Sequence, residues 1–239
     1  MKADGLKKIF RCYGHFYRLY IEGIEPQLCR SVLEITSLPR EAVGAGTDPN
    51  DLFSNSGAAR NLPDAVVIMM NPGSSRPIED GDTDSLLTMP LPAGFQKPLV
   101  LTQPDNTQYQ IMRIMVSKDW KHVRVLNISD LRDPKSPSFI AKTKVLAELP
   151  GGNAHSLFSK VRKSERETML RRKPGAPFIL GWGQDAGLIP LAKQCLSCID
   201  GEKIIAVPAG NDPVLSAHPS PMLQKKKEEW LDAILAATA

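Results

Sequence analysis

The sequence has few cysteines, few aromatic residues and no long apolar run. Four cysteines and 6% aromatic residues occur among 239 residues. Four thiols in a chain of this length do not suggest a disulfide framework. No apolar stretch reaches the roughly 20 residues that a membrane-spanning helix needs, so we expect no membrane partner. Charged and aromatic residues follow Met1 to Lys8, where a signal peptide would have an apolar core, and this favours a cytoplasmic protein.

The composition is that of a folded chain with a mild positive charge. Hydrophobic residues make up 42% of the chain and charged residues 23%. This is enough apolar material for a core and excludes an intrinsically disordered protein. The formal net charge of +4 permits a polyanionic partner but does not require one.

Four short apolar runs predict the strands of a buried sheet, at residues 64–70, 123–127, 177–183 and 203–207. Runs without alternation are typical of parallel strands that are covered on both faces. Helical stretches are expected at residues 106–118, 188–199 and 221–236. We therefore predict an α/β protein with a three-layer α/β/α arrangement and a mostly parallel, four-stranded central sheet. Residues 9–38 are compatible with a strand pair or with an amphipathic helix.

Polar residues and glycines follow three of the predicted strands. Asn71-Pro72-Gly73 follows the first strand, Asn127 ends the second and Gly183 ends the third. In sheets of this kind, ligands bind beyond the carboxyl ends of the strands. The functional site is therefore expected at this edge of the sheet.

Four short motifs resemble the uracil-DNA glycosylase superfamily, in the same order along the chain. The segment from Val66 to Gly73 resembles its first motif, in the form found in the mismatch-specific thymine/uracil branch. Val125-Leu126-Asn127 resembles the strand that ends in a base-reading Asn, and residues 178–183 resemble the strand with Leu-Trp-Gly. His218-Pro219-Ser220-Pro221 is identical to the core of the second motif in the uracil-specific branch. The chain also resembles an uncharacterised bacterial family with similar Asn-Pro, Val-Asn-Leu and Trp-Gly signatures.

This resemblance implies a monofunctional DNA glycosylase, which hydrolyses the N-glycosidic bond of a flipped-out pyrimidine and leaves an abasic site. The motifs span about residues 64–223 as short islands. We accordingly expect an N-terminal arm packed on the core at residues 1–60 and a uracil-DNA glycosylase-like catalytic domain at residues 61–239. The expected partner is DNA, bound by a monomer.

The resemblance assigns the chemistry to two residues. Cleavage of the bond generates an oxocarbenium-like sugar and an anionic base, so it needs a donor aimed at the base and a positioned water. His218 is implied as the donor, and Asn71 is implied to orient the water. The uracil-specific branch has Asp in place of Asn71, and Asn cannot accept a proton. A slower enzyme is therefore expected, and the candidates for an assisting carboxylate are Asp80, Asp82, Asp84 and Asp130.

The pocket for the base is predicted to tolerate substituents on C5 of the pyrimidine. The uracil-specific branch has a Tyr near Gly73 that blocks such substituents, and glycine leaves that space open. The expected substrates are thymine or modified cytosines, up to the hypermodified cytosines of phage DNA, which suggests an antiviral role. The predicted base-binding residues are Met70, Pro72, Gly73, Asn127 and Phe95.

Further residues are predicted to contact DNA around these loops. They are Ser74, Ser75, Ser220, Met222, Lys225 and Lys226, with Met222 or Leu223 as an apolar wedge. Basic runs at residues 160–163 and 171–173 are weaker candidates, because charge runs are usually solvated faces.

Each of these residues also has an ordinary structural explanation. His218 would then lie in a Pro-rich turn and Asn71 would form a turn. Asn127 would cap a strand end, while Phe95 and Met222 would be buried. The alternative function is a non-catalytic nucleic-acid or nucleotide-binding module on the same fold, favoured by Asn at position 71. A hydrolase for small molecules is disfavoured, because the chain has neither a Gly-x-Ser-x-Gly nor a phosphate-cradling Gly-rich motif.

We expect no metal or cofactor. Some branches of the superfamily hold an iron–sulfur cluster on four cysteines, and this chain has Cys12, Cys29, Cys195 and Cys198. Their spacing differs from the usual order of those branches, and Cys195 and Cys198 lie one turn apart in an apolar stretch. Small buried thiols explain this pattern equally well.

Overall fold

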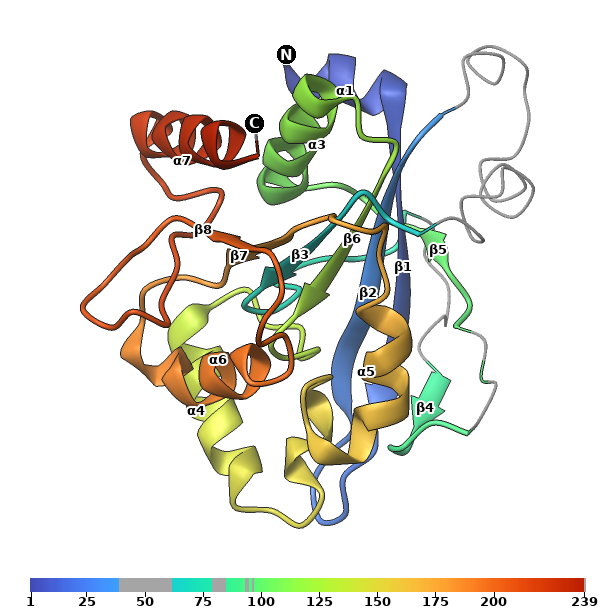
Figure 1. Cartoon of the computed structure of the whole chain (residues 1–239). Coiled ribbons are helices and arrows are strands. Elements are labelled where there is room, and N and C mark those ends of the chain that lie inside the picture. The colour runs from blue at the N-terminus through green and yellow to red at the C-terminus, as the bar shows by residue number, and fades with distance from the viewer. Residues whose placement is uncertain (39–61, 79–84, 93–94, 96, 239) are drawn as a thin grey trace.

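The chain forms an α/β structure around one mixed β-sheet (Figure 1). The computed structural model describes residues 1–38, 62–78, 85–92, 95 and 97–238. Within these residues the sheet has eight strands in the order β4-β1-β2-β6-β3-β7-β8, and β5 pairs with β1 outside this path. Among the described residues, no helix is both long and apolar enough to cross a membrane.

Four parallel strands form one half of the sheet and confirm the four strands predicted from the apolar runs. They are β6 (His122–Asn127), β3 (Ala65–Met69), β7 (Phe178–Gly181) and β8 (Ile204–Ala206), in this spatial order. The chain passes from β3 to β6 on one side and from β7 to β8 on the other. The direction of winding therefore changes between β3 and β7, which is where open α/β sheets bind their ligands.

The predicted sheet of four mostly parallel strands is too small, because the sheet is mixed and has further strands. Two long strands, β1 (Phe10–Leu19) and β2 (Gln27–Ser37), are antiparallel to each other, and β2 is antiparallel to β6. The short strands β4 (Ser85–Leu87) and β5 (Val100–Leu101) pair with the outer side of β1. Both long strands are buried on both faces, so their sequence lacks the period of two that marks a half-buried strand.

The N-terminal segment is therefore hydrogen-bonded into the central sheet. Of the two alternatives for residues 9–38, the strand pair is the one that forms. A division of the chain between residues 60 and 61 stays a prediction.

Six α-helices occur in the described residues. They are α1 (Ala3–Ile9), α3 (Asn106–Lys118), α4 (Ser136–Ala147), α5 (Lys163–Met169), α6 (Ile189–Leu196) and α7 (Gln224–Ala237). Three short 3₁₀ helices are η2 (Gly152–His155), η3 (Lys160–Arg162) and η4 (Ala186–Leu188). The bounds of α3 are those predicted. Asp105 caps the start of this helix, because its carboxylate accepts hydrogen bonds from two backbone N–H groups of the first turn.

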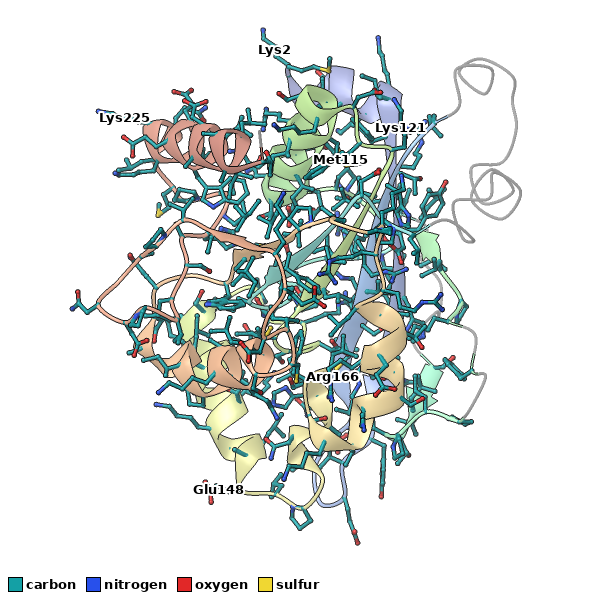
Figure 2. All side chains as sticks on the ribbon, in the orientation of Figure 1. Lys2, Met115, Lys121, Glu148, Arg166 and Lys225 are labelled. Atoms are coloured by element: carbon teal, nitrogen blue, oxygen red, sulfur yellow. The ribbon has the colours of Figure 1, made fainter. Side chains whose placement is uncertain are left out.

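The sheet has an apolar core on each face. Val67 of β3 packs with Met112 of α3 and Trp230 of α7. Its neighbour Ile68 belongs to the opposite core, with Phe139 of α4 and Ala192 of α6. Figure 1 shows α1, α3 and α7 on one side of the sheet and α4 and α6 on the other, and Figure 2 places Met115 on the inner side of α3. Burial on both faces explains why the parallel strands are continuous apolar runs.

Candidate functional site

A cavity of about 560 Å³ lies at the carboxyl ends of β3 and β6, close to the change of winding direction. In Figure 1 the arrowheads of β3 and β6 mark these carboxyl ends and point in the same direction. The walls come from β2, the start of α3, and the loops that follow β3, β6 and β8. The lining residues are Arg30, Met69, Met70, Asn71, Pro72, Gly73, Asp105, Thr107, Gln108, Val125, Asn127, Asp133, Pro134, Ser136, His218, Ser220, Pro221 and Met222. The cavity thus gathers Asn71 and His218 from two loops and Asn127 from the end of β6.

The amide of Asn71 is oriented by the neighbouring loop. Its Nδ2 donates to the backbone oxygens of Leu131, at 3.2 Å, and Asp133, at 2.8 Å. The two loops are also joined by a 2.8 Å bond from the N–H of Ile128 to the oxygen of Met69. Because both amide protons are engaged, Oδ1 of Asn71 is the atom left to accept a hydrogen bond from a water or a ligand.

Gly73 leaves room beside this loop. Its φ is +61°, a left-handed conformation that side chains rarely adopt. A Cβ atom built on Gly73 would meet no other atom within 4 Å. The open side of the loop is therefore available to a bulky ligand group.

The ring of His218 is held in one orientation and one tautomer. Its Nδ1 accepts a hydrogen bond from the backbone N–H of Ser220 at 3.1 Å. The neutral ring must then carry its proton on Nε2. Burial lowers the pKa of His218 below its usual 6.5, although the charge of Asp105 acts in the opposite direction. At neutral pH, His218 therefore offers an uncharged Nε2–H donor.

The loop that carries His218 is anchored to β7 and α3. A Cβ atom on Gly181, the last residue of β7, would lie 2.9 Å from Cδ of Pro219, so only glycine permits this close packing. Nε2 of Gln110 donates to the backbone oxygen of Pro219 at 3.3 Å. The N–H of Gly183 donates to the oxygen of Ser216 at 2.8 Å. Contacts before and after His218 therefore fix its loop.

Asn127 has a buried amide that is not satisfied by the protein. The residue is 1% exposed and lines the cavity. Neither Nδ2 nor Oδ1 has a hydrogen-bond partner in the described part of the chain. An unsatisfied buried polar group costs about 1–3 kcal/mol, and nearly all such groups in folded proteins are paired. A donor and an acceptor are therefore available here to a bound ligand.

Arg30 is a residue of this cavity that the sequence reasoning missed. It lies on β2, is 1% exposed, and donates from Nη1 to Oγ of Ser75 at 2.7 Å. Its one sequence signal is an isolated Arg within an apolar strand, from Leu28 to Leu33. Asp105, Thr107 and Gln108 were also missed, and they form the capped start of α3.

The carboxylates on the cavity wall accept local hydrogen bonds. Asp105 accepts from the N–H groups of Thr107 and Gln108 through Oδ1 alone, whereas Asp133 accepts from the N–H of Lys135 through Oδ1 and from the hydroxyl of Ser138 through Oδ2. Both therefore act as caps of helices or turns.

Of the four candidates for an assisting carboxylate, Asp130 lies within the described residues. Asp130 is fully buried and accepts from Tyr17 and Arg162, and it does not line the cavity. Asp80, Asp82 and Asp84 lie outside the described residues.

Phe95 is not brought to this cavity. It lines a second cavity of about 330 Å³ together with Lys97 and Glu165, and its ring contacts His15 edge-on at 6.1 Å. Phe95 itself thus contacts His15 of β1, and the structure does not place it where a base would stack in the first cavity.

The predicted DNA-contacting residues of the two loops differ in exposure, and Ser75 is not at the surface. Met222 is 99% exposed, which excludes the explanation that it is buried in a helix. Ser220 lines the cavity, Ser74 is exposed, and Ser75 is buried against Arg30.

The lysines of the C-terminal helix are exposed at its start. Lys225 and Lys226 lie in the first turn of α7 and pair with Glu229. Figure 2 shows Lys225 on the side of this helix that faces away from the sheet. Both ammonium groups can therefore reach a phosphate by releasing an exposed ion pair.

Some side chains of the basic runs at residues 160–163 and 171–173 form ion pairs within the protein. Arg162 is fully buried between Asp130 and Glu165. Arg172 pairs with Glu202 and stacks on the ring of Phe178 at 3.7 Å, and Lys173 pairs with Asp64, which precedes β3. The run 171–173 thus lies near the amino ends of the strands, away from the cavity.

The cysteines belong to different parts of the core. Cys12 packs on the face of α3, whereas Cys29 and Cys195 pack on the face of α6. All four thiols are free. Within the described ranges, no group of three or more His, Cys, Asp or Glu side chains could hold a metal ion. The expectation that the protein needs no cofactor stays a prediction.

Comparison with known proteins gives no relative: no family model, no curated protein and no solved structure matches this chain. Membership of the uracil-DNA glycosylase superfamily therefore stays a prediction from the four sequence motifs.

Proposed function

We propose that this chain is a monofunctional DNA glycosylase that removes a C5-substituted pyrimidine from DNA. The observation that supports this most strongly is the buried amide of Asn127, which has no partner in the described residues and shares one cavity with Asn71 and His218. An amide that both donates and accepts can read the edge of a pyrimidine. The target must leave the base stack to reach such a cavity.

The proposed role of each residue follows from the side-chain atom that its hydrogen bonds leave free. The Nε2–H of His218 donates to a carbonyl oxygen of the base, where negative charge develops as the glycosidic bond breaks. Oδ1 of Asn71 accepts from the attacking water and holds it against C1′ of the sugar. Asn71 takes no proton, so positioning and electrostatics supply the catalysis and the reaction is slow.

The choice of substrate rests on the width of the cavity. Its volume of about 560 Å³ lies within the range of roughly 300–1,000 Å³ of small-molecule sites, and the space beside Gly73 is open. We infer a pocket for thymine or for modified cytosines, including the hypermodified cytosines of phage DNA. Such an enzyme would create abasic sites in invading phage DNA and would thereby act in antiviral defence. The same proposal includes a uracil-DNA glycosylase-like fold, a cytoplasmic location and a monomeric state. It also includes DNA contacts by Ser220, Met222, Lys225 and Lys226.

A panel of DNAs tests the proposal. Duplex and single-stranded oligonucleotides carrying uracil, thymine, 5-methylcytosine, 5-hydroxymethylcytosine or a bulkier modified cytosine are incubated with the protein and then treated with alkali. Strand breaks at one or more C5-substituted bases are expected. Breaks at uracil alone would contradict the wide pocket, and the absence of breaks at every base would contradict the glycosylase.

The second candidate is a non-catalytic nucleic-acid or nucleotide-binding module. Two observations favour it: position 71 is Asn, and Asp105 and Asp133 on the cavity wall are engaged as caps. The protein would then bind the modified strand without cleaving it. A gel shift with DNA that remains alkali-stable identifies this outcome.

A further inference from the structure

The cavity wall contains a buried positive charge, Arg30. This side chain is 1% exposed, and its Nη1 donates a hydrogen bond to Oγ of Ser75 at 2.7 Å. Nε has no partner in the described residues, and none of the carboxylates described forms an ion pair with Arg30. Burial lowers the pKa of Arg30 to about 10, although the charge of Asp105 on the same wall acts in the opposite direction, so the side chain is charged at neutral pH. A buried cation without a paired anion is costly, and this one lines a cavity with room for a ligand.

The chemistry proposed for this cavity generates an anion. When the bond between C1′ and N1 of the pyrimidine breaks, its electron pair passes to N1 and is delocalised onto the oxygen at C2. His218 is neutral and contributes a dipole, and Asn127 is neutral as well. Among the cavity-lining residues of the described chain, Arg30 is the cationic side chain.

We infer that Arg30 supplies the positive charge that stabilises the departing pyrimidine anion. This inference rests on the proposed glycosylase function and deepens it, because it names a further group that stabilises the leaving base. The C2 oxygen is common to the pyrimidines of DNA, and Arg30 contributes most when N1 is a poor leaving group. An arginine, which donates hydrogen bonds and accepts none, suits such an oxygen.

The reaction balances without a proton acceptor among the cavity residues. The C1′–N1 bond breaks, and the oxygen of one water bonds to C1′. A proton from that water passes to solvent, and the base anion takes one proton from solvent. The products are an abasic deoxyribose and a neutral free base.

Two other roles for Arg30 have distinct consequences. Arg30 can position the loop after β3 through its hydrogen bond to Ser75, or its guanidinium can bind a DNA phosphate. If Arg30 only positions the loop, its loss slows the release of every base to the same extent. Loss of a phosphate contact weakens DNA binding and reduces its salt dependence by about one charge.

The test compares two bases of similar size that differ in the acidity of N1, thymine and 5-bromouracil. If the wild-type protein acts on cytosines instead, the pair is 5-methylcytosine and 5-bromocytosine. Single-turnover rates are measured for the wild type, Arg30→Gln, Arg30→Lys and Ser75→Ala. We expect Arg30→Gln to slow the methylated base by about 100-fold, as the loss of one anion-stabilising donor does, and the brominated base by about 10-fold. Arg30→Lys and Ser75→Ala should keep the wild-type ratio of the two rates.

The ratio of the two rates within one preparation does not depend on how much of the variant is folded. An unchanged ratio in Arg30→Gln would overturn the inference. So would the same change in ratio in Ser75→Ala, or a salt slope reduced by about one in Arg30→Gln. If the wild type releases no base of the panel, the glycosylase proposal itself fails, and it does so before any variant is compared.

Discussion

Asn71, His218 and Asn127 of the cavity leave hydrogen-bonding atoms for a ligand in different ways. Asn71 is turned by two carbonyl groups, which leave its Oδ1 to accept. His218 is fixed by the N–H of Ser220, which leaves Nε2–H to donate. Asn127 is simply buried without a partner in the described residues. Groups oriented before the reaction need no reorganisation during it, which is the main source of electrostatic catalysis.

Gly73→Tyr tests whether the open space beside the first loop sets the width of the pocket. Both Gly73→Tyr and the control Gly73→Ala should lose about 1–2 kcal/mol of stability, because φ at this position is left-handed. Only the tyrosine fills the space. We expect Gly73→Tyr to reduce excision of a C5-substituted base, relative to its unsubstituted counterpart, by about 10-fold or more, measured in single turnovers. Equal ratios in the two variants would show that Gly73 does not control the width.

At the scale of elements, the strands place the loops and the loops carry the polar residues. Strands β3, β6 and β7 pair in register, so that Met69 lies beside both Asn127 and Gly181. The loop with His218 then reaches the same edge because Pro219 packs on Gly181. The contact between Gly181 and Pro219 therefore helps to position the imidazole of His218.

Gly181→Ala tests this contact. The added methyl group would approach Cδ of Pro219 to 2.9 Å, and the loop would have to move. Because misplacement of a catalytic group by about 1 Å costs about 100-fold in rate, we expect a large loss of excision with little loss of DNA binding. The double variant Gly181→Ala/Pro219→Ala relieves the clash and should recover part of the rate. A single variant as active as the wild type would exclude the positioning role.

The sequence was sufficient for the parallel half of the sheet and for α3, but not for the outer strands. Apolar runs bounded by turn residues give buried strands directly, and the apolar residues between 106 and 118 give the buried face of α3. The strands β1 and β2 are buried on both faces, so their pattern also permitted a helix. Arg30 joins the cavity only through the pairing of β2 with β6, a long-range contact that a local pattern does not contain.

At the scale of the whole molecule, buried polar groups join the N-terminal strands to the rest of the chain. Arg162 donates to Asp130 at 2.6 Å and pairs with Glu165 at 2.7 Å. Tyr17 of β1 donates to the same Asp130 carboxylate at 2.8 Å. Removing one partner of such a network leaves an uncompensated buried charge, so the first 38 residues are integral to the stability of the core.

Buried histidines predict that stability falls in mild acid. Burial lowers the pKa of His15 to about 3 and that of His155 to about 4, and it also lowers the pKa of His218. Below pH 6.5 the unfolded chain binds these protons and the folded chain does not, so the free energy of unfolding decreases as the pH falls. His15 and His155 each contribute up to about 1.4 kcal/mol per pH unit, and His218 contributes in the same direction. Asp130, whose pKa is raised by burial, acts in the opposite direction.

Urea unfolding at pH 7, 6 and 5 measures this slope, with His155→Gln as the matched variant. The wild type should lose stability steadily from pH 6.5 to pH 5, and His155→Gln should lose less per pH unit. A free energy of unfolding that does not change over this range would show that these histidines are protonated in the folded chain.

The most direct measurement of the central claim is the single-turnover rate of base release by His218→Ala, on whichever modified-pyrimidine DNA the wild type cleaves best. Loss of one donor to the developing anion should lower this rate by about 100-fold to 1,000-fold, while the dissociation constant for the same DNA stays close to that of the wild type. A variant that releases the base as fast as the wild type would contradict the assignment of this cavity as the active site of a glycosylase.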